Sequence, residues 1–129
     1  MQYSRNMKNL YLLAFLLLFT SASTDVNYEF SLPSVVKPGQ FIGRVEATDP
    51  NVGQTLTFYI VDGNTNYKAF RIDSITGDLR VNNAPFINTR KKLDFYLTVR
   101  VTDSGGFNKY GKFVRLSAQA TIHIYRLKQ

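Results

Sequence analysis

From Tyr28 onward the hydrophobic pattern of the sequence has a period of two almost everywhere, and turn-forming residues close each run. Successive side chains of a β-strand point to opposite faces of a sheet, so this spacing predicts strands that are buried on one face only. The two clearest inward rows are Phe95, Leu97, Val99 and Val101, then Ala118, Ala120, Ile122 and Ile124. No stretch after residue 23 has a convincing helical period, so we predict an all-β chain.

Seven such runs are separated by short turns, and they lie at residues 30–32, 41–47, 56–60, 70–73, 78–81, 94–101 and 118–124. Seven short strands in about a hundred residues favour two antiparallel sheets packed face to face. An immunoglobulin domain proper would carry a Cys pair around a Trp, and the sequence contains neither residue type. We therefore expect a disulfide-free, immunoglobulin-like, seven-stranded antiparallel Greek-key sandwich.

Residues 1–23 have the pattern of a cleavable secretory signal peptide. Arg5 and Lys8 precede an apolar run over residues 10–19, and Ser21 and Ser23 are the small residues that signal cleavage requires. The run is about ten residues long, whereas a membrane-spanning helix needs roughly twenty; a signal anchor is the alternative. We expect residues 24–129 to form a single domain, secreted or at the cell surface, with no membrane span in the mature chain.

The composition argues against catalysis and against nucleic-acid binding. The chain has no Cys, one His and no clustered carboxylate pair, so it offers no nucleophile with a base and no zinc ligand set. His123 falls on an outward face and is interpreted as a solvated strand residue. The net charge of +7 arises mostly from Lys and Arg scattered singly along strands, which favours a solvated outer face over a nucleic-acid site. We predict no enzyme activity and no nucleic-acid partner.

Two distant strands each end on a Thr-Asp pair followed by turn residues. The acids are Asp49 and Asp103. In a β-sandwich, strands that are far apart in sequence can end at the same pole, so these carboxylates are expected to converge. Two interpretations stand at this point. The acids either cap turns by bonding nearby backbone or contribute to a weak calcium site, because Ca²⁺ prefers oxygen ligands.

The order and spacing of residues over nearly all of 24–129 resemble a cadherin repeat. The matching positions are Phe30, Leu32, Pro33, Pro38, Gly39, Ile42, Gly43, Val45, Ala47, Thr48, Asp49, Pro50, Asn51, Phe70, Ile72, Asp73, Thr76, Gly77, Leu79, Val81, Leu97, Val99, Val101, Thr102, Asp103, Ala120, Thr121, Ile122 and Ile124. This resemblance implies a cadherin-like extracellular sandwich that makes adhesive protein–protein contacts. The implied partner is a protein, either the chain itself or another cadherin-like chain.

In that family, calcium ions bind at the junctions between successive repeats, and the resemblance carries part of the ligand set onto this chain. Asp49 and Asp103 match two of the family's acids. Asn51 stands where the second acid of Asp-x-Asp would be, and Asn27 matches an Asn of the linker. Residues 85–88 replace the family's Leu-Asp-Arg-Glu of the opposite pole. The resemblance therefore implies one weak calcium half-site made by Asn27, Asp49, Asn51 and Asp103.

Two further hypotheses concern aromatic residues. Five tyrosines are expected on outward faces or in loops, where they would suit a secreted ligand- or carbohydrate-binding sandwich with no calcium dependence: Tyr59, Tyr67, Tyr96, Tyr110 and Tyr125. Residues 105–116 hold three aromatic and three basic side chains. That segment predicts a hairpin that extends the sheet or a basic aromatic contact surface, and the alternative is a loop that packs its own side chains.

Overall fold

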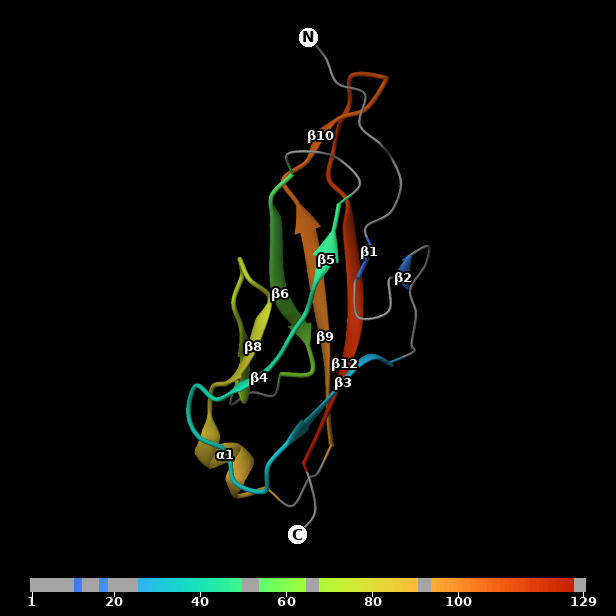
Figure 1. The fold of residues 1–129 in the computed structure, drawn as a ribbon. Coiled ribbons are helices and arrows are strands. Elements are labelled where there is room, and N and C mark those ends of the chain that lie inside the picture. The colour runs from blue at the N-terminus through green and yellow to red at the C-terminus, as the bar shows by residue number, and fades with distance from the viewer. Residues whose placement is uncertain are drawn as a thin grey trace.

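The computed structural model describes residues 26–49, 54–64, 68–90 and 94–126, together with the backbone of 11–12 and 17–18. Two sheets form the body of the molecule (Figure 1). The larger sheet has the order β3 (Val26–Leu32), β12 (Ser117–Arg126), β9 (Asp94–Asp103), β6 (Leu56–Asp62), and the smaller has the order β4 (Phe41–Arg44), β8 (Asp78–Val81), β7 (Phe70–Ile72). The prediction of an all-β sandwich is confirmed.

Neighbouring strands within both sheets run antiparallel except for β3 and β12, which are parallel. The first long strand of the domain therefore lies beside the last, and the order of strands in space differs from their order in the chain. The β3–β12 ladder shifts register between Thr121 and Ile122, and Asn27 lies opposite this bulge. β9 and β12 pair over nine positions, so these two strands form the central ribbon of the larger sheet.

Five two-residue strands complete the described part of the sheet structure. They are β1 (Tyr11–Leu12), β2 (Leu17–Leu18), β5 (Ala47–Thr48), β10 (Gly106–Phe107) and β11 (Phe113–Val114). β1 pairs with both β2 and β5, and β10 pairs with β11 as a hairpin. The assignment of residues 1–23 to a signal peptide, and with it the domain boundary at 24, stays a prediction.

The expectation of no helix is wrong at one place, because α1 (Ala84–Asn88) follows β8. The Asn83 side chain accepts a hydrogen bond from the Phe86 amide at 3.2 Å and caps the N-terminus, and Pro85 occupies the first turn. Five residues are too few for a helical period to show in the sequence. The Asn88 side chain then forms two hydrogen bonds with the backbone of Val36. It donates to the Val36 carbonyl at 2.9 Å and accepts from the Val36 amide at 2.8 Å.

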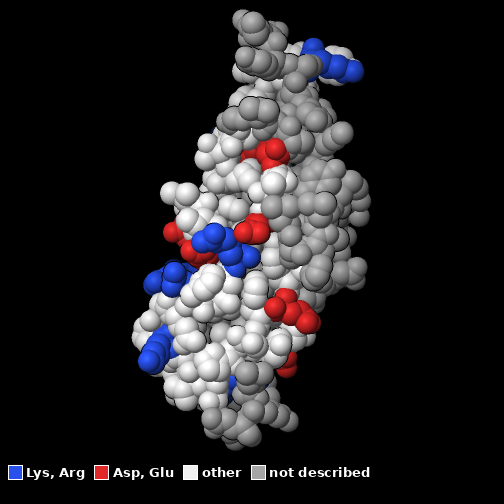
Figure 2. All heavy atoms as spheres, in the orientation of Figure 1, with Lys and Arg blue, Asp and Glu red and all other residues white. Residues whose placement is uncertain are grey.

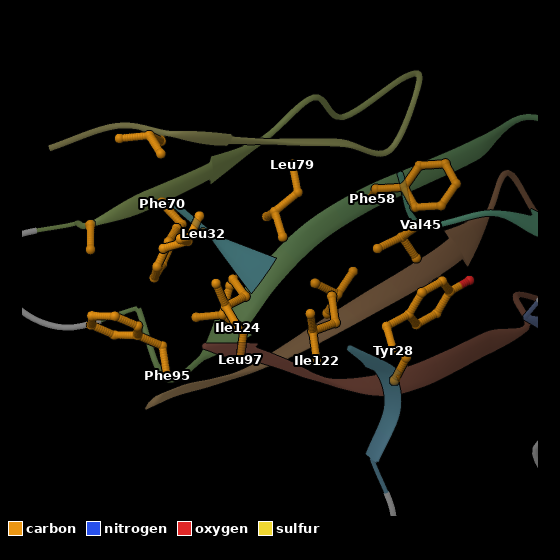
Figure 3. Close-up of a cluster of buried hydrophobic side chains, with 14 of the residues drawn as sticks. Tyr28, Leu32, Val45, Phe58, Phe70, Leu79, Phe95, Leu97, Ile122 and Ile124 are labelled. Atoms are coloured by element: carbon orange, nitrogen blue, oxygen red, sulfur yellow. The ribbon is translucent and has the colours of Figure 1, made fainter. Parts of the chain in front are cut away.

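The core lies between the two sheets (Figure 3). The predicted inward rows of β9 and β12 are confirmed, since all eight of their side chains are buried. Across from them lie Val45, Phe70, Leu79 and Val81, and Phe70 meets Phe95 edge to face with ring centroids 5.2 Å apart. Packing of this kind, with no disulfide available, stabilises the domain mainly by burial of apolar surface.

Candidate functional site

Asp103 ends β9 at one pole of the sandwich and is 4% exposed. Its Oδ1 accepts hydrogen bonds from the amides of Gly105 and Leu116, both at 3.0 Å. Its own amide donates to the Leu116 carbonyl at 3.1 Å. The side chain therefore joins the end of β9 to the start of β12. A carboxylate has about four lone-pair sites, so two amide bonds do not by themselves prevent it from binding a cation.

Asp49 follows β5, and the chain connection places it near the same pole. Gln54, five residues after Asp49, accepts a hydrogen bond at 2.9 Å from the hydroxyl of Ser104, the neighbour of Asp103. The Ser104 hydroxyl also accepts from the Thr55 amide at 3.1 Å. In Figure 1, β5 and β9 run in the same direction and end at the same end of the molecule. The ends of β5 and β9, which lead to the two predicted acids, thus point to the same pole, and a shared site for Asp49 and Asp103 stays a prediction.

The approach of β5 to this pole is fixed by Tyr28. The Tyr28 ring is buried, and its hydroxyl meets both backbone groups of Glu46, the carbonyl and the amide, at 3.2 Å. Residues 45–46 separate β4 from β5, and the Val45 amide donates to the Gly77 carbonyl at 3.0 Å. Tyr28 of β3 and Gly77 of the β7–β8 turn therefore hold the backbone that leads through β5 to Asp49.

Asn27, another predicted ligand, lies elsewhere. It is 5% exposed, and its Oδ1 accepts from the Thr121 amide at 3.0 Å, at the bulge between β3 and β12. Thr121 pairs with Thr98, which is five residues before Asp103 on β9, or about 17 Å along an extended strand. The structure does not bring Asn27 to the pole. In this position the amide oxygen replaces a backbone acceptor that the bulge removes from the ladder.

The remaining predicted ligand, Asn51, lies outside the described residues. Among the residues that the structure does describe, no group of three or more acidic, His or Cys side chains is arranged to hold a metal ion. The pole therefore supplies two carboxylates, whereas calcium takes six to eight oxygen ligands. These residues fit part of a calcium site, and the other ligands would have to come from backbone, water or another chain.

Two hydrogen-bonded acids, Asp73 and Asp78, flank the turn that joins β7 to β8. Asp73 Oδ1 accepts from the amides of Thr76 and Ile75, both at 2.8 Å, and these bonds, that of Thr76 foremost, lower the pKa of Asp73. The hydrogen bond from Arg44 Nε at 2.6 Å is the main cause that lowers the pKa of Asp78. In its ionised form Asp73 stabilises the turn between β7 and β8, and Asp78 joins β8 to Arg44 of β4, so these side chains serve the fold.

The outer face of the larger sheet carries a cluster that the sequence did not reveal, which we call the acidic patch: Glu29, Asp94, Tyr96, His123 and Tyr125. His123 Nε2 lies 2.7 Å from Asp94 Oδ1, and His123 Nδ1 lies 3.5 Å from Glu29 Oε1. The His123 ring stacks on Tyr96 with centroids 4.6 Å apart and planes within 4°. His123 faces outward as predicted, but its side chain is only 16% exposed, so it is mostly covered by its neighbours and less solvated than expected. The neighbouring strands place Tyr96 and Glu29 beside His123 and cover it. A pattern read along one strand cannot show which residues lie opposite on its neighbours.

At the opposite end of β9, residues 106–115 form what we call the basic hairpin. Phe107 and Phe113 pair edge to face, yet they are 55% and 50% exposed, and Tyr110 at the tip is 80% exposed. Lys109 lies over the Tyr110 ring, and Arg115 lies over the Phe113 ring. The prediction that this segment extends the sheet as a hairpin is confirmed. Figure 1 shows it projecting beyond the sandwich.

Comparison with known proteins connects this architecture to one family. The model of the cadherin domain matches residues 28–124. Rat Cadherin-23 is 33% identical over 101 residues, which cover 76% of this chain and 3% of that protein. The Drosophila melanogaster protein "Protocadherin-like wing polarity protein stan" is 34% identical over 97 residues, 75% of this chain and 2% of that protein. The chain thus spans only a few hundredths of the length of these relatives.

Solved structures agree with the fold. The structure of human Protocadherin-24 EC1-2 has a TM-score of 0.72 and 18% sequence identity, and it covers 98% of this chain and 56% of that one. Mouse Cadherin-23 EC22-24 has a TM-score of 0.69 at 22% identity, covering 97% of this chain and 34% of that one. The molecule is therefore an all-β Greek-key sandwich of the type seen in these ectodomains.

The chain belongs to the cadherin family, as the resemblance of its residues implied. Domains of this family are extracellular, mediate protein–protein contacts and generally bind calcium. Within the described residues, no helix is long and apolar enough to cross a membrane.

Proposed function

We propose that the chain is an extracellular adhesion module that makes protein–protein contacts through its sandwich surface, and that Asp49, Asn51 and Asp103 form a weak calcium half-site at one pole. Membership of the cadherin family supports the module. The observation that carries the half-site is the buried Asp103 carboxylate, which two amides orient at the pole that Asp49 also approaches. Asn27 is left out of the ligand set because it serves the β3–β12 bulge.

A bound calcium ion would neutralise the two carboxylates and tie the β5–β6 connection to the end of β9. The chain's own part is to present Asp103 in a fixed orientation, through Leu116 and Gly105, so that little side-chain entropy is lost on binding. Because few carboxylates are present, we expect a dissociation constant of about 10⁻⁴ to 10⁻³ M, the range of extracellular modules.

Secretion and calcium binding can be tested together. The full chain would be expressed in secretory cells and recovered from the medium, and its mass would show whether residues 1–23 have been removed. Calorimetric titration with calcium would then compare the wild type with the double variant Asp49→Ala, Asp103→Ala. Saturable heat in the wild type alone supports the half-site. No heat up to about ten millimolar calcium, well above the expected range, contradicts it.

The alternative of a carbohydrate platform is not favoured by the aromatic residues of the acidic patch. The Tyr96 and His123 rings stack at 4.6 Å, close to the spacing of neighbouring strands, so they stand upright side by side. Rings in this arrangement turn their edges to the solvent, whereas a sugar stacks on an open ring face. The absence of catalysis stays a prediction.

A further inference from the structure

The basic hairpin holds a large share of the exposed apolar surface. Eight large apolar side chains are exposed in the described part of the chain, and three of them, Phe107, Tyr110 and Phe113, lie in this short segment. The other five come from separate strands and turns: Val35, Phe41, Val61, Ile75 and Tyr96. Tyr67, another tyrosine expected at the surface, lies outside the described residues. Single exposed apolar residues are ordinary, whereas several on one projection indicate a contact surface.

The same segment is basic. Lys109, Lys112 and Arg115 are exposed, and no residue after Asp103 is acidic. Two acids lie towards the base of the hairpin. Asp103 is 4% exposed, with its carboxylate bonded to two amides, and Asp49 is partly buried. In Figure 2, basic atoms mark the upper end of the molecule, where Figure 1 places the hairpin, and the acidic atoms on this face lie further down.

Hydrogen bonds and ring packing make the hairpin a firm projection. The Asn108 side chain accepts from the amides of Tyr110 and Lys112 at 2.9 and 3.0 Å, which fixes the turn. Phe107 and Phe113 lie opposite each other in the β10–β11 ladder, with ring centroids 5.5 Å apart. The rings are thus held in place before any partner arrives, so little conformational entropy is lost on docking.

Positive charges lie over two of the rings. Lys109 Nζ is 5.1 Å from the centroid of the Tyr110 ring, and the guanidinium carbon of Arg115 is 5.7 Å from that of the Phe113 ring. Each pair combines a cation with an apolar surface. This combination suits the boundary of a bilayer, where aromatic rings settle at the level of the headgroups and anionic headgroups attract Lys and Arg.

We propose that the basic hairpin docks the chain end-on to a membrane whose surface carries anionic headgroups. Tyr110 at the tip enters the headgroup layer, and Lys109, Lys112 and Arg115 pair with the headgroup anions. The acidic patch does not oppose this contact, because Asp94 is at the far end of β9. That strand spans about 30 Å, or about three Debye lengths at 0.1 M salt. This role goes beyond protein–protein contact.

A sulfated polysaccharide fits the hairpin less well than a membrane. Such a polyanion would pair with the three cations but would leave Phe107 and Tyr110 exposed to water. One face of the Tyr110 ring and one of the Phe113 ring already lie under a cation, so these faces are not open for a sugar to stack on. A bilayer surface uses both the rings and the charges.

Vesicle binding tests the proposal. The secreted full chain would be sedimented with vesicles of phosphatidylcholine alone or mixed with phosphatidylserine, in a chelator that removes calcium. Each basic side chain near an anionic surface contributes about fivefold to binding, so three should favour the anionic vesicles by about a hundredfold. In about 1 M salt, where the Debye length is about 3 Å, most of this preference should be lost. Equal binding to both vesicles, or none to either, overturns the proposal.

A pair of variants with equal charge locates the contact. Lys109→Gln with Lys112→Gln should weaken binding to anionic vesicles by about 25-fold. Lys37→Gln with Lys68→Gln removes the same charge near α1, which Figure 1 places at the end opposite the hairpin. This control should bind almost as the wild type does, because its lysines lie several Debye lengths from the docked surface. Equal weakening by both variants would mean that net charge alone drives binding, and the proposal would be wrong.

A single Trp reports on the depth of the tip. The chain contains no Trp, so Tyr110→Trp introduces one reporter at a position that is 80% exposed. On anionic vesicles its emission should shift to shorter wavelengths and be quenched by brominated lipid. Phe41→Trp is the control, since Phe41 is 49% exposed at the start of β4, away from the hairpin. A shift at both positions, or at neither, contradicts end-on docking.

Heparin beads separate the membrane from a soluble polyanion. If the wild type binds heparin through Lys109 and Lys112 but does not bind the vesicles, the partner of the hairpin is a polyanion and the inference is wrong. Vesicle binding that survives Tyr110→Ser at full strength also contradicts it, because the ring would then take no part. Because the chelator excludes calcium, none of these results depends on the half-site, and the proposed adhesion function stands or falls separately.

Discussion

Asp103 accepts a hydrogen bond from the amide of Leu116, thirteen residues further along the chain, at 3.0 Å. The same oxygen accepts from Gly105, so a single side chain fixes both ends of the connection that carries the basic hairpin. This acid therefore has a structural role as well as a proposed calcium-binding role. The Asp103 carboxylate can cap the turn and bind calcium at the same time. Substitutions that keep or remove its oxygen and its charge distinguish the two roles.

Asp103→Ala should lower the free energy of unfolding in calcium-free buffer by about 1–3 kcal/mol, because two amides lose their acceptor. Asp103→Asn keeps an oxygen at the same place and should cost less than about 1 kcal/mol. Urea denaturation with a chelator present measures both values. Equal losses for the two variants would show that the charge, and not the acceptor atom, stabilises the connection.

Asn27→Ala should destabilise the domain by about 1–3 kcal/mol, since the partly buried Thr121 amide would lose its partner at the bulge. The calcium affinity should be unchanged, because Asn27 lies far along the sheet from Asp103. Denaturation and calorimetry on the same preparation test the two statements. A variant of wild-type stability with weakened calcium binding would return Asn27 to the ligand set.

Gly77→Ala and Gly111→Ala form a matched pair. Both glycines have positive φ, +78° and +76°, so each substitution incurs a left-handed penalty of about 1–2 kcal/mol. A Cβ at Gly77 would also collide with the Val45 carbonyl oxygen, whereas a Cβ at Gly111 meets nothing. Thermal denaturation should therefore show a clearly larger loss of stability for Gly77→Ala. Equal losses would mean that the turn before β8 can move away from Val45.

The stability of the domain should fall in acid partly through Asp73. Its pKa is lower in the folded chain than the ordinary value of 3.8, so the unfolded chain binds the proton more readily. The stabilisation is complete above about pH 4 and is lost as the pH falls through the folded-state pKa. Asp73→Asn should be less stable than the wild type near pH 7 and should lose less on acidification. Parallel pH curves for the two proteins would contradict this role.

The sequence predicted the sandwich well because alternation reports burial directly. The alternate apolar residues from Phe95 to Val101 and from Ala118 to Ile124 are buried as expected. With a period of two, only one face of each strand is apolar, and that face must be the one that turns to the core. The sequence did not predict α1 because five residues are too few to show a helical period. Its only signals are local, namely the capping Asn83 and a Pro in the first turn.

The sequence predicted less of the functional surfaces because they depend on register. Tyr96 meets His123 only because β9 and β12 pair at that position, and a shift of one strand by one residue would turn its side chain to the other face. In the same way, Asn27 finds its partner 94 residues away, a contact that no local pattern encodes. Spacing indicated that Asp49 and Asp103 share a pole, but it could not show that Asp103 also holds the backbone.

The most direct test of the calcium half-site is the thermal midpoint of the secreted chain with chelator and with about ten millimolar calcium, comparing wild type with Asp103→Asn. We predict that calcium raises the midpoint of the wild type, because binding to the folded state alone stabilises it. The midpoint of Asp103→Asn should not change, although that variant is nearly as stable as the wild type without calcium. Equal shifts in both proteins, or none in the wild type, would contradict a calcium-binding role for this pole.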